Sequence, residues 1–377
     1  MPVYLDCAAT TPPDPRVLDV CLRYLREDFG NAGSRTHAHG AAARKAVERA
    51  RDQVAAAAGA RRGDVVFTSG ATESNNLALL GLADAGIAAG KKHLVSTAIE
   101  HRAVLEPLQA LERRGFRLTL VRPGRGGWID PEAVASAVRD DTLLVSVMHV
   151  NNETGVIQPL GEIAELLASS AVYFHCDAAQ GFAKAPHLHE RIDLISISGH
   201  KLCAPKGVGA LIVRRRGRER PPLSPLLFGG GHEQGLRPGT LPVALIAAFG
   251  EAVELWSREA GERWQRGLDF RRRMLEGLAP LQPVIHGDPQ RCLPFILNVS
   301  IPGTDAESVM EAWSDLVSIS SGAACTSQSY TCSHVLAAMD VPPECAAGAL
   351  RFSWTHVTEM PDLAAMVIAL QEAASPR

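Results

Sequence analysis

The sequence predicts an α/β protein with a large, mostly parallel sheet and a smaller α+β domain. Short apolar runs of strand length alternate with helical stretches from about residue 60 to residue 215. Near-continuous Val, Ile and Leu runs in such an alternation are typical of parallel strands that helices cover on both faces. A Pro- and Gly-rich stretch over 221–231 interrupts this rhythm, and the mixed pattern after it indicates a second unit.

The elements follow in order along the chain. Strands of the large sheet are expected at 64–68, 93–97, 116–121, 142–150, 171–176, 193–198 and 209–213. Helices are expected over 73–83, over 103–114 and from about Pro242. Strands of the smaller domain are expected at 295–301, 317–320 and 350–354. We expect a large domain over 15–255 and a small domain formed by 1–14 and 256–377.

Composition narrows the class of protein. The chain has 377 residues, of which 46% are hydrophobic and 21% charged, which excludes disordered and fibrous proteins. A formal net charge of −3 favours neither direct nucleic-acid binding nor a membrane surface. Eight cysteines without a C-x-x-C pair fit neither a metal site nor a disulfide framework. Because no apolar run of membrane length and no signal peptide is visible, we expect a cytoplasmic protein.

Polar residues follow five of the predicted strands. These segments lie at 69–73, 100–101, 151–155, 177–180 and 198–201. A single polar residue after a strand is more often a turn former than a ligand. Ligands of open α/β sheets, however, bind beyond the carboxyl ends of the strands. Five such segments at one edge therefore predict a binding site.

A lysine amine and a carboxylate at this edge indicate the kind of ligand. The chain has only six lysines against 32 arginines, and Lys201 lies in a Ser-Gly-His-Lys turn. A lysine amine can form a Schiff base with a carbonyl cofactor, and Asp177 could pair with a pyridinium nitrogen. The alternative is that Lys201 is a solvated loop lysine.

Three neighbouring groups could hold the rest of such a cofactor. Thr72, Ser198 and His200 could share a phosphate, since a helix start offers N–H groups to an anion. His101 could stack on a ring. The Thr72 turn alone is equally well explained as a helix cap. Together, a phosphate anchor, a lysine and a pyridinium carboxylate indicate pyridoxal phosphate (PLP).

Two residues outside the large sheet complete the candidate set. Cys325 lies among Gly, Ala, Ser and Thr residues, which keep a thiolate accessible, whereas most free cysteines are small buried hydrophobic residues. Cys332, seven residues later, is either an inert thiol or one that approaches Cys325 and then receives sulfane sulfur from it or closes a protective disulfide with it. Arg351 lies in a short strand pattern, where a buried guanidinium would need a carboxylate such as that of a substrate.

These residues resemble those of the PLP-dependent cysteine desulfurases, which belong to the class V aminotransferases of fold type I. Ser-Gly-His-Lys at 198–201 and Ser-Gly-Ala-Ala-Cys-Thr-Ser at 321–327 are the most specific matches. Further motifs match in order at 4–6, 8–12, 29–31, 67–74, 148–153, 177–180, 205–207, 229–233 and 239–240. The resemblance covers nearly the whole chain.

The resemblance implies a role for each matching residue. The catalytic residues would be Lys201, which holds PLP and moves the α-proton, His101 and Cys325. The cofactor would contact Ala71, Thr72, His101, Asn152, Asp177, Gln180, Ser198, His200 and Lys201. Thr240 would reach the phosphate in a partner subunit, which implies a homodimer. Asn152 and Arg351 would orient the carboxylate of L-cysteine, and Cys325 would take its sulfur as a persulfide, leaving L-alanine.

The sulfur then passes to an acceptor protein. The seven residues between Cys325 and Ser333 resemble the long cysteine loop of the desulfurases that serve iron–sulfur assembly. Residues 328–332 depart from the Leu-Glu-Pro common there, and we expect no scaffold-docking tail beyond Arg377. The chain could therefore also supply sulfur to a specialised pathway, either DNA phosphorothioation or tRNA thiolation. DNA phosphorothioation is the specialised pathway that we prefer. The alternatives to a desulfurase are a PLP-dependent lyase or aminotransferase of the same fold and a sulfur carrier without turnover.

Overall fold

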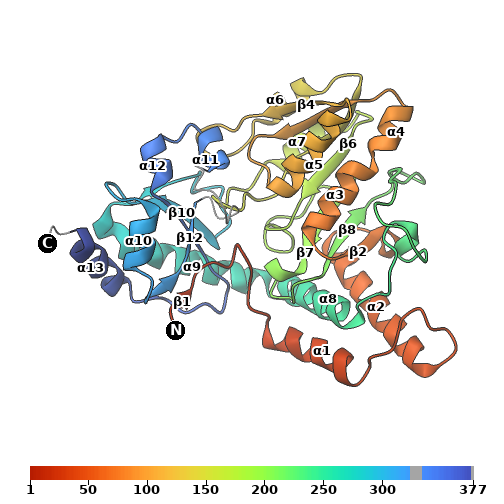
Figure 1. Ribbon diagram of the computed structural model, residues 1–377, viewed down its shortest axis with the longest axis horizontal. Coiled ribbons are helices and arrows are strands. Elements are labelled where there is room, and N and C mark those ends of the chain that lie inside the picture. Colours follow the sequence, from red (N-terminus) through yellow and green to blue (C-terminus); the bar gives the residue numbers. More distant parts are fainter. Residues whose placement is uncertain (323–332, 375–377) are drawn as a thin grey trace.

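The computed structural model describes residues 1–322 and 333–374, which form two units that lie side by side (Figure 1). The strands of the large sheet are β2 (Val65–Thr68), β3 (His93–Thr97), β4 (Arg117–Val121), β5 (Thr142–Ser146), β6 (Tyr173–Asp177), β7 (Leu194–Ser198) and β8 (Gly209–Val213). Their order in space is β2-β8-β7-β6-β5-β3-β4. Strand β8 runs antiparallel to both of its neighbours, and the other pairs are parallel.

Helices cover both faces of this sheet. They are α1 (Pro15–Arg26), α2 (Ala38–Ala57), α3 (Ala71–Gly81), α4 (Ala83–Ala88), α5 (Arg102–Arg113), α6 (Pro131–Ala137), α7 (Leu160–Leu166) and α8 (Val243–Arg258). Val66 and Leu94 pack in one apolar cluster with residues of α3 and α5, whereas Val65 and Val95 pack in the other with residues of α1, α2, α7 and α8. This period of two explains why the strands are apolar throughout.

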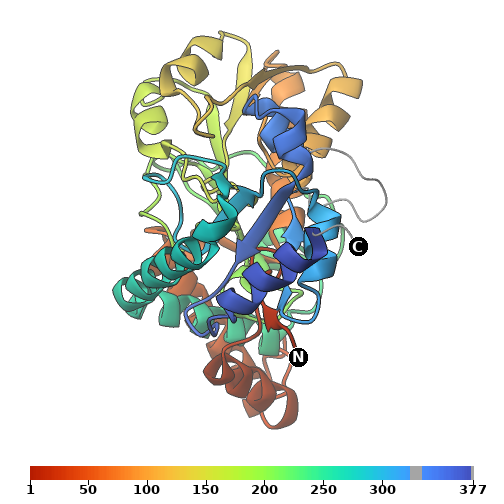
Figure 2. The ribbon, with the colours of Figure 1, turned by 90° about the vertical axis from the view of Figure 1, so that its left-hand side faces the viewer.

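The smaller unit has a sheet of its own (Figure 2). Its strands are β9 (Val284–Ile285), β10 (Ile296–Ser300), β12 (Ser320–Ser321) and β13 (Ala349–Ser353), paired antiparallel in the order β12-β13-β10-β9. Beside it, β1 (Val3–Tyr4) pairs with β11 (Val317–Ser318). The helices here are α9 (Ala260–Leu278), α10 (Ala306–Ala312), α11 (His334–Ala338), α12 (Pro343–Ala347) and α13 (Leu363–Ala374).

The predicted fold class is confirmed, with two differences in the strands. The strand expected over 142–150 ends at Ser146, because the N–H of Met148 is bound by the Glu100 carboxyl group instead of a carbonyl of β3. The strand expected over 317–320 is divided between β11 and β12, which lie in different sheets. The sequence analysis made no prediction for strands β1 and β9 or for helices α1, α2, α4, α6 and α7, and its domain boundaries remain a prediction.

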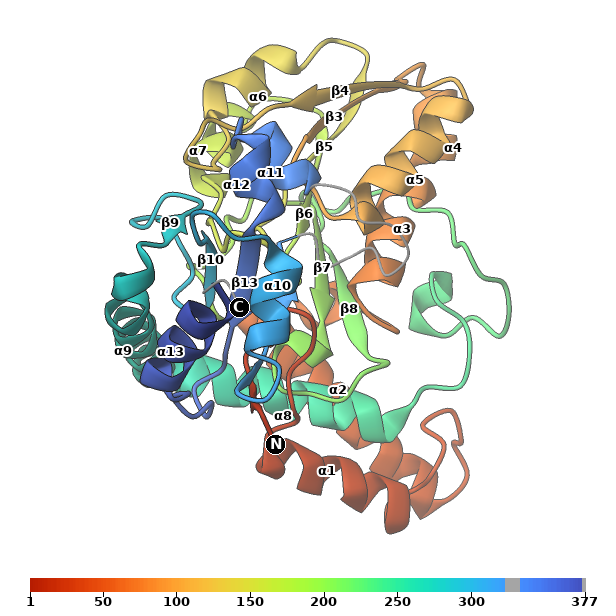
Figure 3. The same cartoon turned by 60° about the vertical axis from the view of Figure 1, so that its left-hand side comes forward.

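The order of the strands brings the carboxyl ends of five of them to one edge of the large sheet (Figure 3). Strands β2, β3, β5, β6 and β7 all point the same way, so their carboxyl ends meet there. Ser198 at the end of β7 pairs with Gly209 at the start of β8, and residues 199–208 form the loop between them. This loop carries Lys201. None of the helices described is both long enough and apolar enough to cross a membrane.

Candidate active site

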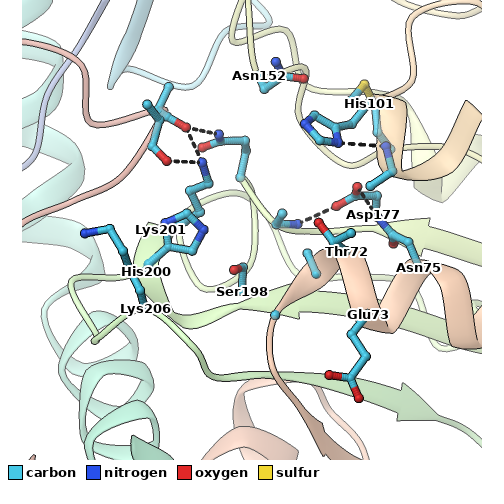
Figure 4. Close-up of a pocket in the computed structure, with 18 of the residues that line it drawn as sticks. Thr72, Glu73, Asn75, His101, Asn152, Asp177, Ser198, His200, Lys201 and Lys206 are labelled. Carbon is cyan, nitrogen blue, oxygen red and sulfur yellow. Dashed lines mark hydrogen bonds between the residues drawn. The ribbon is translucent and has the colours of Figure 1, made fainter. Parts of the chain in front are cut away.

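A cavity of about 480 Å³ opens at the carboxyl ends of these five strands (Figure 4). Ala8 and Ala9 of the N-terminal segment and Arg351 of β13 complete its wall. The sequence-predicted residues that line it are Ala71, Thr72, His101, Asn152, Asp177, Gln180, Ser198, His200, Lys201 and Arg351. The structure thus brings together ten candidates from both units.

The start of α3 forms one end of the cavity. Gly70 precedes the helix at φ +155°, and its Cα lies so close to β8 that a Cβ on Gly209 would come within 2.6 Å of it. No side chain caps the helix at Gly70, and the Glu73 carboxylate accepts instead from the N–H of Ser69, at 2.8 Å. The first turn is therefore available to an anion, which the helix dipole favours.

His200 lies beside this anion site and is neutral. Burial, together with the positive charges of Lys201, Lys206 and Lys184, lowers its pKa to about 4. Its Nδ1 lies 3.2 Å from the Thr10 hydroxyl. A neutral imidazole can donate one N–H to a phosphate without adding charge.

Asp177 ends β6 deeper in the cavity, and both of its oxygens are held. Oδ2 accepts from Asn75 Nδ2 at 2.7 Å, and Oδ1 accepts from the N–H of Ala179 at 3.0 Å. Asn75 is fully buried on α3, and its Oδ1 has no hydrogen-bond partner among the described residues. The sequence analysis missed Asn75, although an Asn beside Ser74 in an apolar helix was the available signal.

Lys201 extends into the cavity from the loop after β7 (Figure 4). Its Nζ donates to the backbone carbonyls of Ala8, at 2.5 Å, and Ala9, at 2.7 Å. Gln180 Nε2 donates to the same Ala8 carbonyl at 2.8 Å. The N-terminal segment, which the sequence analysis cited only as a motif, therefore positions the lysine amine.

His101 caps α5 at the opposite wall. Its Nδ1 accepts from the N–H of Ala103 at 3.1 Å, which assigns the ring proton to Nε2. Burial lowers its pKa, so the ring is neutral and suited to stacking. Below it, Glu100 is fully buried, and burial raises its pKa to about 8. Oε1 of Glu100 accepts from the Thr97 hydroxyl and from the N–H of Met148, each at 2.8 Å.

Arg351 lies at the other end of the cavity and already has a carboxylate partner. Its Nη2 lies 2.7 Å from Asp6 Oδ1, and its Nη1 donates to the backbone carbonyl of Asn152 at 3.1 Å. The second of these bonds connects Arg351 and Asn152, the two residues expected to hold the substrate carboxylate. The sequence analysis missed the role of Asp6, because nothing in the pattern pairs two residues at opposite ends of the chain.

One described candidate, Thr240, does not line this cavity. Thr240 is exposed on the segment between η3 (Glu233–Gly235) and α8. Cys325 and Cys332 lie outside the described residues. Among residues 1–322 and 333–374, no cluster of His, Cys, Asp and Glu side chains is arranged to hold a metal ion.

The residues fit a phosphate-bearing pyridine aldehyde. An anion site at α3, a buried carboxylate at Asp177 and a lysine amine at Lys201 face one cavity. These are the three groups that PLP needs for its phosphate, its ring nitrogen and its carbonyl carbon. The guanidinium of Arg351 adds a site for a carboxylate at the far end.

Comparison with known proteins gives consistent matches. The family model for aminotransferase class V matches residues 3–366. The cysteine desulfurase IscS of Anaeromyxobacter dehalogenans is 47% identical over 356 residues, which are 93% of this chain and 87% of the relative. The solved structure of a NifS-like protein has a TM-score of 0.89 at 33% identity and covers 99% of this chain and 98% of its own. DndA from Streptomyces lividans has a TM-score of 0.82 at 49% identity, over 93% of this chain and 99% of its own.

Proposed function

The chain belongs to the class V aminotransferases, as a PLP-dependent cysteine desulfurase, and we propose that the cavity at the edge of its large sheet converts L-cysteine to L-alanine. One observation carries the assignment to this cavity. The Lys201 amine, the Asp177 carboxylate and the start of α3 face the same space as Arg351. Cofactor groups and a carboxylate site are therefore within reach of one small amino acid.

PLP, when bound, supplies an electron sink that stabilises negative charge on the substrate α-carbon. Lys201 would hold the cofactor and would move the substrate α-proton through its Nζ. Asp177 keeps the ring nitrogen protonated, and Asn75 and the Ala179 N–H hold that carboxylate in place. His101, neutral because burial lowers its pKa, would stack on the ring.

Arg351 and Asn152 orient the substrate. A guanidinium binds a carboxylate in a defined plane, and the Asn152 amide is positioned by its own backbone bond to Arg351. Binding through the carboxylate holds the α-carbon of the substrate close to Arg351. This selects α-amino acids over simple thiols.

Cys325 accepts the sulfur. Its thiolate attacks the substrate sulfur, the carbon–sulfur bond breaks with its electron pair left on the carbon skeleton, and a persulfide remains on Cys325. The carbon skeleton gains a proton at that carbon and leaves as L-alanine. This step separates a desulfurase from an aminotransferase, which has no use for a thiol.

Two variants test this reaction. Purified protein is given L-cysteine, alanine is quantified, and persulfides are located by peptide mass mapping. Cys325→Ser should form neither alanine nor persulfide catalytically, whereas Cys345→Ser, at a partly buried thiol of the small unit, should match the unmodified enzyme. Full alanine and sulfide production by Cys325→Ser would favour a lyase. Protein without the yellow absorbance of bound cofactor would favour a sulfur carrier.

A homodimer is part of the proposal. Thr240 is exposed and does not line the cavity of its own chain. Both features are expected of a residue that contacts the phosphate bound in the partner subunit. Leu227 and Phe228, at 52% and 88% exposure, lie on the same connection before α8. Large exposed apolar side chains are typical of an interface. Light scattering should give twice the chain mass, and Phe228→Asp should reduce it to one chain.

The persulfide passes to an acceptor protein in the cytoplasm. Identities of 47% to IscS and 49% to DndA differ too little to choose between pathways. The residues at 328–332 favour a specialised acceptor, and DNA phosphorothioation is the pathway that we propose for it. Capture of partner proteins by the persulfide form tests this proposal, and recovery of an iron–sulfur scaffold would contradict it.

A further inference from the structure

The ion pair between Asp6 and Arg351 lies beside the proposed carboxylate site. Arg351 is 98% buried on β13, whereas the Asp6 side chain retains 19% exposure. One Asp6 oxygen binds Nη2 of Arg351, and the Asn152 carbonyl takes Nη1. The Ser320 hydroxyl, 3.5 Å from Nη2, is only a marginal contact.

Arg351 retains capacity for a second carboxylate. Its buried Nε has no hydrogen-bond acceptor among the described residues, and a guanidinium has five N–H donors in total. Because the side chain lines the cavity and each of its two bonded terminal nitrogens carries two N–H groups, an incoming carboxylate can bind the guanidinium while Asp6 remains in place.

Asp6 is not needed to hold the N-terminal segment against β13. Backbone bonds already do so: Ser353 donates to the Leu5 carbonyl at 2.7 Å, and Cys7 donates to the Ser353 carbonyl at 3.1 Å. The N–H of Ala8 also donates to the Ser353 hydroxyl at 2.7 Å. The carboxylate of Asp6 is therefore free for a task other than attachment.

We propose that Asp6 is a built-in counter-charge that limits the affinity of Arg351 for α-carboxylates, so that the product L-alanine leaves the site. The inference rests on the proposed function, in which Arg351 binds the substrate carboxylate. A buried guanidinium without a partner is costly, and a ligand that neutralised it would bind very tightly. Asp6 supplies that partner and repels an incoming carboxylate.

The chemistry of the reaction makes such a limit useful. L-cysteine and L-alanine carry the same carboxylate, so any gain in carboxylate affinity holds substrate and product equally. Uniform binding lowers KM without raising kcat. A site with a lone buried cation would therefore retain L-alanine and be inhibited by it.

The test uses Asp6→Asn, which keeps the shape and a hydrogen-bond acceptor but removes the charge. The inhibition constant of L-alanine should fall by roughly tenfold, as expected when a like charge a few ångströms away is removed, and KM for L-cysteine should fall with it. L-alaninamide, which lacks the carboxylate, is the matched control, and its inhibition constant should not change. Asp6→Glu should resemble the unmodified enzyme. Asp6→Ser should repeat the tightening, and it replaces Asp6→Asn if that variant fails to fold.

A merely structural role predicts the opposite sign. If Asp6 only stabilised the fold, its loss would raise KM for L-cysteine and the inhibition constant of L-alanine, and it would raise the inhibition constant of L-alaninamide equally. Either this result or no change in the constants would overturn the proposal. Arg351→Gln separates this failure from failure of the proposed function. If Arg351→Gln leaves KM for L-cysteine unchanged, the carboxylate assignment itself is wrong. If it raises KM while Asp6→Asn does not tighten L-alanine, only the counter-charge is wrong.

Discussion

The two ends of the active-site cavity are built in different ways. At the cofactor end, the sheet alone brings the residues together, because each lies at or after the end of one of its strands: Thr72, His101, Asp177 and Lys201. At the carboxylate end, Arg351 of the small sheet meets Asp6, 345 residues away in sequence. The first end is a property of one sheet edge, and the second exists only when the termini of the chain have met.

The two ends also differ in charge. Burial lowers the pKa of both His101 and His200, the latter to about 4, so both rings are neutral. The cofactor end therefore surrounds Lys201 and Asp177 with neutral donors and the start of α3. The carboxylate end is a charged pair. We therefore expect substitutions at the cofactor end to act on kcat and those at the carboxylate end to act on KM.

Lys201→Ala gives the largest expected effect. Turnover should fall by roughly 1,000-fold or more, because one amine both holds the cofactor and moves the proton. Some PLP should remain bound through the phosphate site at α3. Alanine production and cofactor content are measured for Lys201→Ala and for the control Lys45→Ala. Lys45 is exposed, so its variant should behave as the unmodified enzyme does. Normal alanine production from Lys201→Ala would contradict the assignment.

Asp177→Asn should lower kcat by about 100-fold or more while PLP stays bound. The neutral amide cannot keep the ring nitrogen protonated, so the electron sink is lost. Steady-state kinetics with L-cysteine and the absorbance of the bound cofactor are the two measurements. An unchanged kcat would show that another group binds the ring nitrogen.

Asn75→Ala tests whether Asp177 depends on its buried neighbour. The 2.7 Å hydrogen bond from Asn75 is to a charged group, so its loss should lower kcat by about tenfold with little change in KM. The cofactor absorbance band should also shift, which a purely structural loss would not produce. Asn76→Ala, at the next position and half-buried, is the control, because its amide donates to the backbone carbonyl of Thr72 and not to Asp177. Equal effects of the two variants would argue against a role for Asn75.

Glu100→Gln gives the smallest expected effect on turnover and tests the neutrality of the cofactor end. Burial raises the pKa of Glu100 from 4.5 to about 8, so the folded protein keeps a proton that the unfolded chain releases above about pH 4.5. The associated stability is complete below that pH and is lost as the pH rises to 8. Glu100→Gln does not titrate, so its unfolding free energy should rise relative to the unmodified enzyme by about 1.4 kcal/mol per pH unit across that range. Denaturant unfolding at pH 5, 6.5 and 8 measures this; a constant difference would mean that Glu100 is ionised throughout.

The sequence predicts the cofactor end far better than the carboxylate end. Each cofactor residue stands directly after an apolar run, so local order along the chain was enough to place Asp177 and Lys201 at one edge. Arg351 was expected to await a substrate carboxylate, whereas Asp6 already binds it. That pairing depends on the contact of β13 with the N-terminal segment, which no local pattern encodes. Asn75 was missed for a similar reason, since its partner lies on another element.

The most direct measurement is the identity of the lysine that holds the cofactor. Borohydride reduction of the holoenzyme links PLP irreversibly to its lysine, and peptide mapping then locates the added mass. Lys184 and Lys206 lie close enough to influence the pKa of His200, so either of them is an alternative lysine to which PLP could be linked. We predict that the mass is found on Lys201 and on no other lysine. A label on Lys184 or Lys206, or no label on a protein that still makes alanine, would contradict the account of this site.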